Sequence, residues 1–423
     1  MKPSVAVVGG GWAGCATALT LAEAGVNVTL FEASRTLGGR ARSATLDGRH
    51  LDNGQHLLLG AYRTSLALIA RVQPPSSVDA LWRLPLRLET PPDFQLSSTR
   101  LPAPFNLLTG LLGAKGLGWH EKWITMRWVH TLLNRASAID DTTVAQLTHT
   151  QPERARRLLW YPLCIAALNT PPEIASARTF IDVLRAAFGG TRSDSDFVLP
   201  RTDLSALFPL PAATRIRELG GQVVLGQRVH AIETARDSIT LRLSGETASF
   251  THVVIASAPQ HLAALTEYVR ELDGARRMTL TYCYFPIATG YVQVDPGFQL
   301  AQPLIALRDG PAQYVFDRGH SHGQPGMLAF VASAARPLPA HWLDLAEAQL
   351  QRVASPGNPH WRRAIVEKQA TYACVPGLPR PTVHTPHPRL YLAGDYTAGP
   401  YPATLESAMS SGVQSAHALL NSL

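Results

Sequence analysis

The sequence is poor in cysteine and in charged side chains, and it has no long uninterrupted apolar segment. Four cysteines stand far apart among 423 residues. They show neither metal-site spacing nor a disulfide framework, which suits a reducing compartment. No apolar run reaches the length of a transmembrane helix. Charged residues make up only 16% of the chain against 46% apolar residues, so we expect a globular protein with a large core.

Features of several functional classes are also missing. Lysine and arginine number 38 against 31 acidic residues, a formal charge of +7, but no dense basic run supports nucleic-acid binding. An anionic membrane face fits this charge better, and an ordinary basic surface is the alternative. The pair His320 and His322 does not by itself make a metal-ligand set, so we expect no metal site.

The N-terminal stretch has the pattern of a dinucleotide-binding fold. An apolar run from Val5 to Val8 is short enough for one buried strand. Gly9, Gly11 and Gly14 follow at G-x-G-x-x-G spacing. The first glycine permits a tight turn, the second lets the backbone approach a pyrophosphate, and the third lets a helix pack closely on the strand.

The elements that should follow complete this pattern. A helix over residues 13–24 would direct its N-terminal N–H groups at the phosphates. A second strand over residues 26–31 leads to Glu32, which is placed to accept hydrogen bonds from the ribose hydroxyls of an adenosine. The alternative is a glycine-rich turn without a ligand, and the residues after Glu32 argue against it.

A second glycine pair follows closely. Arg35, Gly38, Gly39 and Arg40 form an R-x-x-G-G-R run, which resembles the second glycine motif of the flavin amine oxidase and carotenoid desaturase superfamily. An ordinary NAD site does not need this pair, so the resemblance implies FAD. It also implies that Arg40 lies near the FAD pyrophosphate and the flavin.

The C-terminal region resembles the third FAD motif of the same superfamily. A short apolar run leads to Gly394 and Asp395, and a helix follows the segment Tyr401–Ala408. The resemblance implies that Asp395 bonds the ribityl or pyrophosphate region, and that N–H groups of Thr404 and Leu405 face the flavin pyrimidine ring. The predicted cofactor-binding residues are Gly9, Gly11, Trp12, Ala13, Gly14, Glu32, Ala33, Arg35, Gly38, Gly39, Arg40, Val229, Gly394, Asp395, Thr404 and Leu405.

A narrower resemblance rests on three blocks of residues. The run D-N-G-Q-H-L-L-L-G-A-Y over residues 52–62, the block 160–212 with L-x-x-L-F-P-x-P-A, and the C-terminal block 391–408 resemble the hydroxysqualene dehydroxylases, squalene-associated FAD enzymes of hopanoid biosynthesis. The resemblance implies reduction of a C30 isoprenoid alcohol, hydroxysqualene, to squalene by hydride from reduced FAD. Since no second nucleotide fingerprint is present, we expect a separate electron donor.

Four residues are candidates for the chemistry. His56 lies in a polar cluster close to the cofactor motifs, and we hypothesise that its imidazolium protonates the leaving hydroxyl. Asp52 or Glu406 would orient His56 or substitute for it. Tyr401 would shape the flavin face and steady a cation through its ring. A structural role for His56 is the alternative.

The expected fold is α/β, with a Rossmann-type FAD-binding domain interleaved with an α+β substrate domain, as in amine oxidases. Residues 1–75, 205–264 and 371–423 would form the FAD-binding domain, and residues 76–204 and 265–370 the substrate domain. We expect substrate-domain strands at residues 280–284, 289–294, 313–316 and 327–332. A squalene enzyme should be cytoplasmic, in peripheral contact with the inner membrane face.

Alternatives remain open at this stage. The same FAD motifs serve isoprenoid desaturases and protoporphyrinogen oxidases, and less suitably amine oxidases, while Rab-escort-like proteins use the architecture to bind prenyl chains without flavin. The segment 105–136 also has two interpretations. It forms either a core helix pair over the substrate cavity, or a membrane-surface segment with its tryptophans and leucines inward and its basic residues at the head groups.

Overall fold

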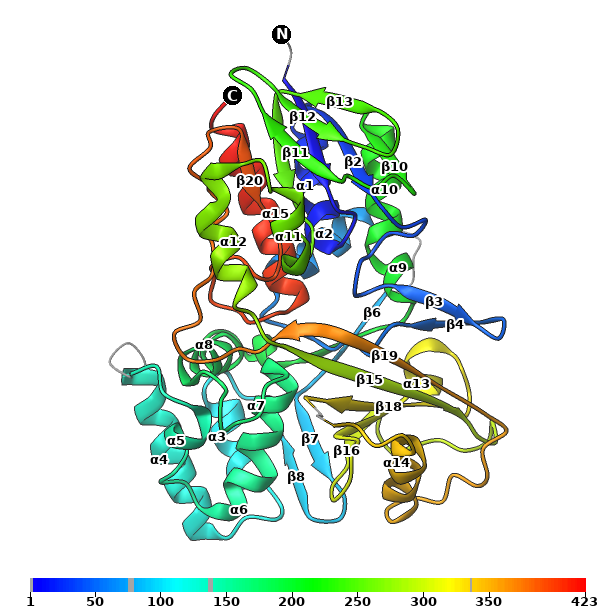
Figure 1. Cartoon of the computed structure of the whole chain (residues 1–423). Coiled ribbons are helices and arrows are strands. Elements are labelled where there is room, and N and C mark those ends of the chain that lie inside the picture. The colour runs from blue at the N-terminus through cyan, green and yellow to red at the C-terminus, as the bar shows by residue number, and fades with distance from the viewer. Residues whose placement is uncertain (1–2, 75–79, 136–139, 335–336) are drawn as a thin grey trace.

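The computed structural model of the chain describes residues 3–74, 80–135, 140–334 and 337–423. The upper lobe in Figure 1 is built on a parallel five-stranded sheet and contains both chain ends. The strand order is β10 (Gln222–Leu225), β2 (Asn27–Glu32), β1 (Ser4–Val8), β14 (His252–Ile255) and β20 (Leu390–Leu392).

Both faces of this parallel sheet are covered, which is why residues 5–8 of β1 are all apolar. Val5 and Val7 of β1 pack into the core formed with the helices α1 (Trp12–Glu23), α10 (Pro209–Glu218) and α15 (Leu405–Leu420). Ala6 and Val8, on the opposite face, pack into the core beneath a three-stranded meander. The meander consists of β11 (Ala231–Thr234), β12 (Ile239–Arg242) and β13 (Thr247–Phe250).

The lower lobe holds an antiparallel sheet whose two long strands, β15 and β19, lie side by side below the upper lobe (Figure 1). Its order is β16 (Leu304–Ala306), β17 (Tyr314–Asp317), β18 (Met327–Ser333), β15 (Tyr284–Gln293) and β19 (Trp361–Tyr372). Ala288 and Val292 of β15 pack with α14 (Trp342–Gln351). Tyr291 packs into a second core, which it shares with the helical segment over residues 105–195. The sheet therefore separates two cores.

The helical segment and short strands complete the fold. Its helices are α3 (Phe105–Leu112), α4 (Trp119–Arg135), α5 (Val144–Leu147), α6 (Glu153–Ala155), η2 (Arg156–Trp160), α7 (Tyr161–Leu168), α8 (Ala177–Phe188) and η3 (Arg192–Ser195). The other helices are α2 (Arg63–Val72), α9 (Leu204–Leu207), α11 (Pro259–Leu265), η4 (Arg270–Leu272), α12 (Asp273–Leu280) and α13 (Arg318–His322). The short strands are β3 (Ser43–Leu46), β4 (Arg49–Asp52), β5 (Leu58–Leu59), β6 (Leu81–Leu84), β7 (Arg87–Thr90), β8 (Phe94–Ser97) and β9 (Phe197–Pro200).

The predicted α/β fold class is confirmed, but two details of the lower lobe differ from expectation. Leu280 ends the helix α12, and β15 begins only at Tyr284, so the strand predicted over residues 280–284 is wrong. The long strand β19 was not predicted, because it lies at the sheet edge and its many exposed charged side chains hide its apolar pattern.

Candidate active site

A cavity of about 930 Å³ extends from the glycine motifs of the upper lobe into the lower lobe. Backbone of the glycine motifs and of residues 227–230 forms part of its wall. Apolar side chains from several elements line the part within the lower lobe: Leu163, Phe180, Leu184, Phe188, Phe316 and Val331. One continuous space therefore joins a nucleotide-type cradle to a large apolar compartment.

The two glycine motifs contact each other and form one cradle. The Gly38 N–H donates to the Gly10 carbonyl at 2.8 Å. A Cβ atom added at Gly39 would lie 3.2 Å from the Cα atom of Gly11, so a larger residue would narrow the gap between the motifs. Gly9 and Gly38 have φ angles of +116° and +107°, which L side chains rarely adopt. This cradle fits the pyrophosphate of a dinucleotide.

Helix α1 begins directly at the cradle. A Cβ at Gly14 would lie 1.8 Å from the Gly9 carbonyl oxygen, so glycine is needed for the helix to pack on the turn. Gly14 itself does not line the cavity, whereas Trp12 and Ala13 do. Trp12 Nε1 donates to the Ala41 carbonyl at 2.7 Å, and this bond fixes the loop after the second glycine pair against α1.

Glu32 lies at the end of β2, where its carboxylate is held by two backbone N–H groups. Oε2 accepts from the Gly10 N–H at 2.6 Å and Oε1 from the Ser34 N–H at 2.7 Å. Each oxygen keeps a second lone pair for a ribose hydroxyl. Ala33 also lines the cavity. Arg35 is exposed and is not a lining residue, so its contact with the cofactor stays a prediction.

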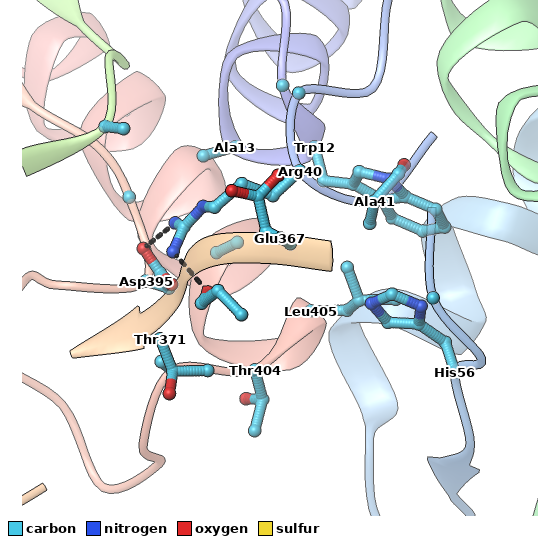
Figure 2. Close-up of a pocket in the computed structure, with 18 of the residues that line it drawn as sticks. Trp12, Ala13, Arg40, Ala41, His56, Glu367, Thr371, Asp395, Thr404 and Leu405 are labelled. Carbon is cyan, nitrogen blue, oxygen red and sulfur yellow. Dashed lines mark hydrogen bonds and ion pairs between the residues drawn. The ribbon is translucent and has the colours of Figure 1, made fainter. Parts of the chain in front are cut away.

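Arg40 connects the second and third motifs. Its guanidinium donates to Asp395 Oδ1 at 2.7 Å and to the Ala370 carbonyl at 2.8 Å (Figure 2). Glu367 of β19 lies beside it in Figure 2 and accepts from Asn53 Nδ2 at 3.1 Å. Segments that are more than 300 residues apart in the sequence therefore meet at one wall of the cavity.

The remaining predicted cofactor residues also border the cavity. Gly394 lines it, and so do Thr404 and Leu405 at the start of α15. The Thr404 side chain accepts from the Ser407 N–H at 3.1 Å and caps the helix. The first N–H groups of the helix have no intrahelical partner. Val229 is buried and lines the cavity beside the meander. The donors present thus fit FAD.

His56 lines the cavity, as Figure 2 shows, and its Nδ1 atom is buried without a hydrogen-bond partner in the described part of the chain. Burial lowers the pKa of His56 to about 4, although a backbone interaction with Gly54 opposes this change. The side chain is therefore neutral near pH 7. A buried charge without a counter-ion is costly, so an imidazolium at this position has to form against that cost, and the acid role of His56 stays a prediction.

Asp52 does not line the cavity, and its carboxylate is engaged elsewhere. Oδ1 accepts from the Leu204 N–H at 2.8 Å, and Oδ2 accepts from Arg318 Nη1 at 3.1 Å. Burial raises the pKa of Asp52, and Arg318 opposes that change. The orienting role of Asp52 toward His56 stays a prediction. Arg318 also donates to Gln55 at 3.3 Å, so the ion pair holds the loop that carries His56.

Glu406 is held at the start of α2, and its predicted role beside His56 stays a prediction. Its carboxylate accepts from the N–H groups of Thr64 and Ser65 at 3.0 and 2.8 Å, and it satisfies free donors in the first turn of α2. Tyr401 does not line the cavity. It packs edge-on against Tyr62, with ring centroids 5.4 Å apart. Of these two tyrosines, Tyr62 lines the cavity.

Sequence reasoning missed four residues of the site region: Tyr62, Arg318, Tyr314 and Glu367. Tyr62 closes the D-N-G-Q-H-L-L-L-G-A-Y run, so its proximity to His56 in the sequence was an available signal. Arg318 and Glu367 gave no such signal, because their partners lie more than 260 residues away in the sequence. Tyr314 lies on β17, whose short apolar run indicates only a buried strand.

A metal site and a membrane span are both missing from the described residues. Within those ranges, no group of three or more His, Cys, Asp or Glu side chains is arranged to hold a metal ion. Within the same ranges, no helix combines the length and the apolar character needed to cross a bilayer.

The Arg40–Asp395 pair gives a direct test of the cradle. We expect Arg40→Met to weaken FAD binding by about 10- to 100-fold, since a charge-assisted hydrogen bond at the cofactor wall is lost. The dissociation constant is measured by titrating apoprotein with FAD. Arg63→Met is the matched control, because Arg63 pairs with Asp194 at 3.2 Å outside the cavity lining. Equal affinities in the three proteins would remove Arg40 from the cofactor site.

Comparison with known proteins agrees with this geometry. The profile of the family described as flavin containing amine oxidoreductase matches residues 12–420. A hydroxysqualene dehydroxylase of Rhodopseudomonas palustris is 27% identical over 450 residues, covering 99% of both chains. Another from Sinorhizobium fredii is 25% identical and covers 100% of this chain and 99% of its own. A 15-cis-phytoene desaturase of an Oncidium hybrid is 25% identical, covering 99% and 78%.

Solved structures share the fold at low sequence identity. A triple mutant of putrescine oxidase superposes with a TM-score of 0.76 at 16% identity, covering 99% of both chains. Cyclohexylamine oxidase from Brevibacterium oxydans gives a TM-score of 0.74 at 15% identity, covering 100% of this chain and 99% of its own. At these identities the likeness extends to the two-domain architecture alone.

Proposed function

The chain belongs to the flavin-containing amine oxidoreductase family, and from that premise we propose that it reduces hydroxysqualene to squalene with hydride from FAD. The observation that supports this proposal most strongly is the cavity that joins the glycine cradle to an apolar compartment. Long apolar chains need such a compartment, while charged amine substrates do not. Full-length similarity to hydroxysqualene dehydroxylases supports the same conclusion.

The reaction replaces a hydroxyl by hydrogen. One hydride and one proton enter, the carbon–oxygen bond breaks, and water leaves. FAD, when bound and reduced, supplies the hydride. The protein must deliver the proton and exclude other water, because an allylic cation would be trapped by it. The apolar side chains of α7, α8 and β17 provide the dry walls.

We assign the proton to His56. Its free Nδ1 atom lies in the cavity wall, where it can bond a substrate hydroxyl. Because its lowered pKa leaves the His56 imidazole neutral near pH 7, the imidazole must take up a proton before it can donate one. A negative charge bound nearby would raise its pKa and favour that uptake. The ring of Tyr62 lines the same cavity and would stabilise the cation that forms.

An isoprenoid desaturase is the second candidate. Carotenoid desaturases also match nearly the whole chain, at 24–25% identity, and the apolar compartment would accept their type of substrate. Such an enzyme runs the flavin in the opposite direction and takes hydride from the hydrocarbon. It needs no leaving-group acid, so the free Nδ1 atom of His56 favours the reductive direction.

The remaining assignments are also proposals. The enzyme would act in hopanoid biosynthesis at the inner face of the cytoplasmic membrane, because its C30 substrate dissolves in lipid. A separate donor would reduce FAD. Residues 1–75, 205–264 and 371–423 would bind FAD, and residues 76–204 and 265–370 would bind the isoprenoid.

An anaerobic single turnover tests the function. The purified flavoprotein is reduced with dithionite and mixed with hydroxysqualene. We expect flavin reoxidation and squalene formation at equal rates, followed by absorbance and by lipid extraction. The same experiment with oxidised enzyme and squalene or phytoene is the control. Bleaching of the oxidised flavin there, with no reaction of the reduced enzyme, would identify a desaturase instead.

A further inference from the structure

A cluster of large apolar side chains is exposed on the outside of the helical segment. The cluster comprises Leu101, Phe105, Leu112, Trp119 and Trp123. Trp119 is 75% exposed and Trp123 is 59% exposed. Exposed apolar side chains are common singly, but five within 23 residues, two of them tryptophan, form an unusual surface. We call this set the α3–α4 face.

The two tryptophans are not needed to hold α4 in place. They are four residues apart and so lie on the same side of the helix. The opposite side is already anchored, since Trp128 packs on Trp160 with ring centroids 4.9 Å apart and Leu132 is buried. The helix thus has one apolar side for the core and another left without a partner among the described residues.

The α3–α4 face is held together as one surface. Lys122 Nζ donates to the Leu112 carbonyl at the end of α3 at 2.8 Å. The same ammonium lies 4.9 Å from the centroid of the Trp119 ring. A single buried lysine therefore fixes the exposed tryptophan to the neighbouring helix.

The charges around this face favour an anionic partner. Residues 100–131 contain four basic side chains, Arg100, Lys115, Lys122 and Arg127, and one acidic side chain, Glu121, which gives a formal charge of +3. Arg100, Lys115 and Arg127 are exposed. The Glu121 carboxylate accepts from the Gly118 N–H at 2.7 Å, so part of its negative charge is offset by the backbone at the start of α4. Tryptophan beside basic side chains suits a lipid interface.

The helix α3 of this face packs on the hairpin that borders the apolar compartment. Helix α3 packs on β8, and a Cβ at Gly110 would lie 2.4 Å from the Ser97 carbonyl oxygen. Strand β8 pairs with β7, whose Leu88 lines the main cavity. A smaller hollow beside β7 shares four of the main cavity's lining residues: Leu88, Leu163, Leu304 and Tyr314. Apolar lining therefore continues toward the hairpin that carries α3.

We propose that the α3–α4 face docks on an anionic lipid bilayer, with Trp119 and Trp123 inserted at the headgroup level and Arg100, Lys115 and Arg127 near the phosphates. This surface would deliver a lipid-dissolved substrate to the compartment next to β7. That purpose rests on the proposed function, whereas the docking itself depends only on the surface.

Vesicle binding tests the docking without any substrate. The holoenzyme is sedimented with vesicles containing phosphatidylglycerol, and with pure phosphatidylcholine vesicles. We expect binding to the anionic vesicles that weakens with added salt. The W119S/W123S double variant should bind at least about tenfold more weakly, because the inserted apolar area is lost. The matched control is Y268S/L280S, which removes two equally exposed apolar side chains elsewhere.

Turnover with detergent-dispersed substrate separates the two proposals. W119S/W123S should turn over at the wild-type rate in detergent, which also shows that it is folded. Equal vesicle binding by the wild type and this variant, or no binding by the wild type, would overturn the docking surface. A wild-type dimer that becomes monomeric in W119S/W123S would assign the face to a second copy instead. Vesicle binding without hydroxysqualene reduction would leave the docking intact and refute only the function.

Discussion

Replacing His56 with alanine should slow reduction of the alcohol by about 10²- to 10⁴-fold while FAD stays bound, which is the usual contribution of a positioned proton donor. His56 Nδ1 is a buried polar atom of the cavity wall for which the described residues offer no partner. The rate of flavin reoxidation in an anaerobic single turnover measures the effect. His387→Ala is the control, because His387 is also buried but does not line the cavity.

The pH dependence makes this prediction sharper. Burial lowers the pKa of His56 to about 4, so the protonated form is a small fraction at pH 7. If that form is required, the wild-type rate should rise as the pH falls, by about tenfold for each pH unit while the pH stays above the pKa of His56 in the reduced complex. His56→Ala should show no such rise. A flat wild-type profile, or a full rate in the alanine variant, would mean that another group supplies the proton.

The acid end of this profile needs a folding control. The same lowered pKa means that the unfolded chain takes up a proton, near pH 6.5, that the folded chain resists until about pH 4. The contribution of His56 to stability is therefore fully present above pH 6.5 and is lost as the pH falls toward 4. Circular dichroism at each pH shows whether the protein remains folded where the rate is measured.

Replacing Arg318 with methionine should destabilise the protein by about 3–5 kcal/mol, because it leaves a buried carboxylate without its cation. The Arg318 and Asp52 side chains are 1% and 4% exposed and lie 3.1 Å apart. Urea unfolding measures the change. Arg71→Met is the matched control, since Arg71 and Glu23 form a pair of 2.7 Å at the surface, and exposed pairs contribute at most about 1 kcal/mol.

The sign of the pH effect identifies the cause. Burial raises the pKa of Asp52 and Arg318 opposes this, so removing Arg318 should raise the pKa further. A carboxyl whose folded pKa lies above its unfolded value favours folding at low pH and loses that contribution as pH rises. The deficit of Arg318→Met should therefore be larger at pH 8 than at pH 5. The double variant Arg318→Met/Asp52→Asn should recover much of the loss at pH 8.

An equal loss of folding stability in Arg318→Met at pH 5 and at pH 8 would contradict this account of the Arg318–Asp52 pair. It would indicate that lost packing, and not an unpaired carboxylate, explains the destabilisation. Because Arg318 also bonds Gln55 beside His56, reduction of the alcohol should slow in Arg318→Met even where the variant is fully folded. Retained turnover in folded Arg318→Met would limit Arg318 to stability.

The sequence by itself determined the cofactor and the fold class. Local patterns were sufficient there, because a strand, a tight glycine turn and a helix must follow one another in the chain to form the cradle. The structure has β1, the turn at Gly9 and α1 in that order. The R-x-x-G-G-R run and Gly394–Asp395 carried the likeness to flavoproteins in the same local way.

Only the tertiary structure decided which side chains meet at the site. Asp52 and Glu406 are near His56 or the flavin motif in sequence, yet each carboxylate bonds elsewhere: Asp52 to Arg318, and Glu406 to the first turn of α2. Glu367 reaches the cavity from an unpredicted edge strand. Proximity along the chain cannot give these pairings, because they join segments hundreds of residues apart.

Charge states and exposure depend on the same long-range packing. From the sequence alone, a histidine in a polar run is expected to have the ordinary imidazole pKa. Burial in the cavity lowers the pKa of His56. The segment 105–136 fits a core helix pair and a surface segment equally well by pattern. Packing of Trp128 inward left Trp119 and Trp123 outward. Sequence fixes which apolar faces a helix has, and only the folded neighbours determine which of them is covered.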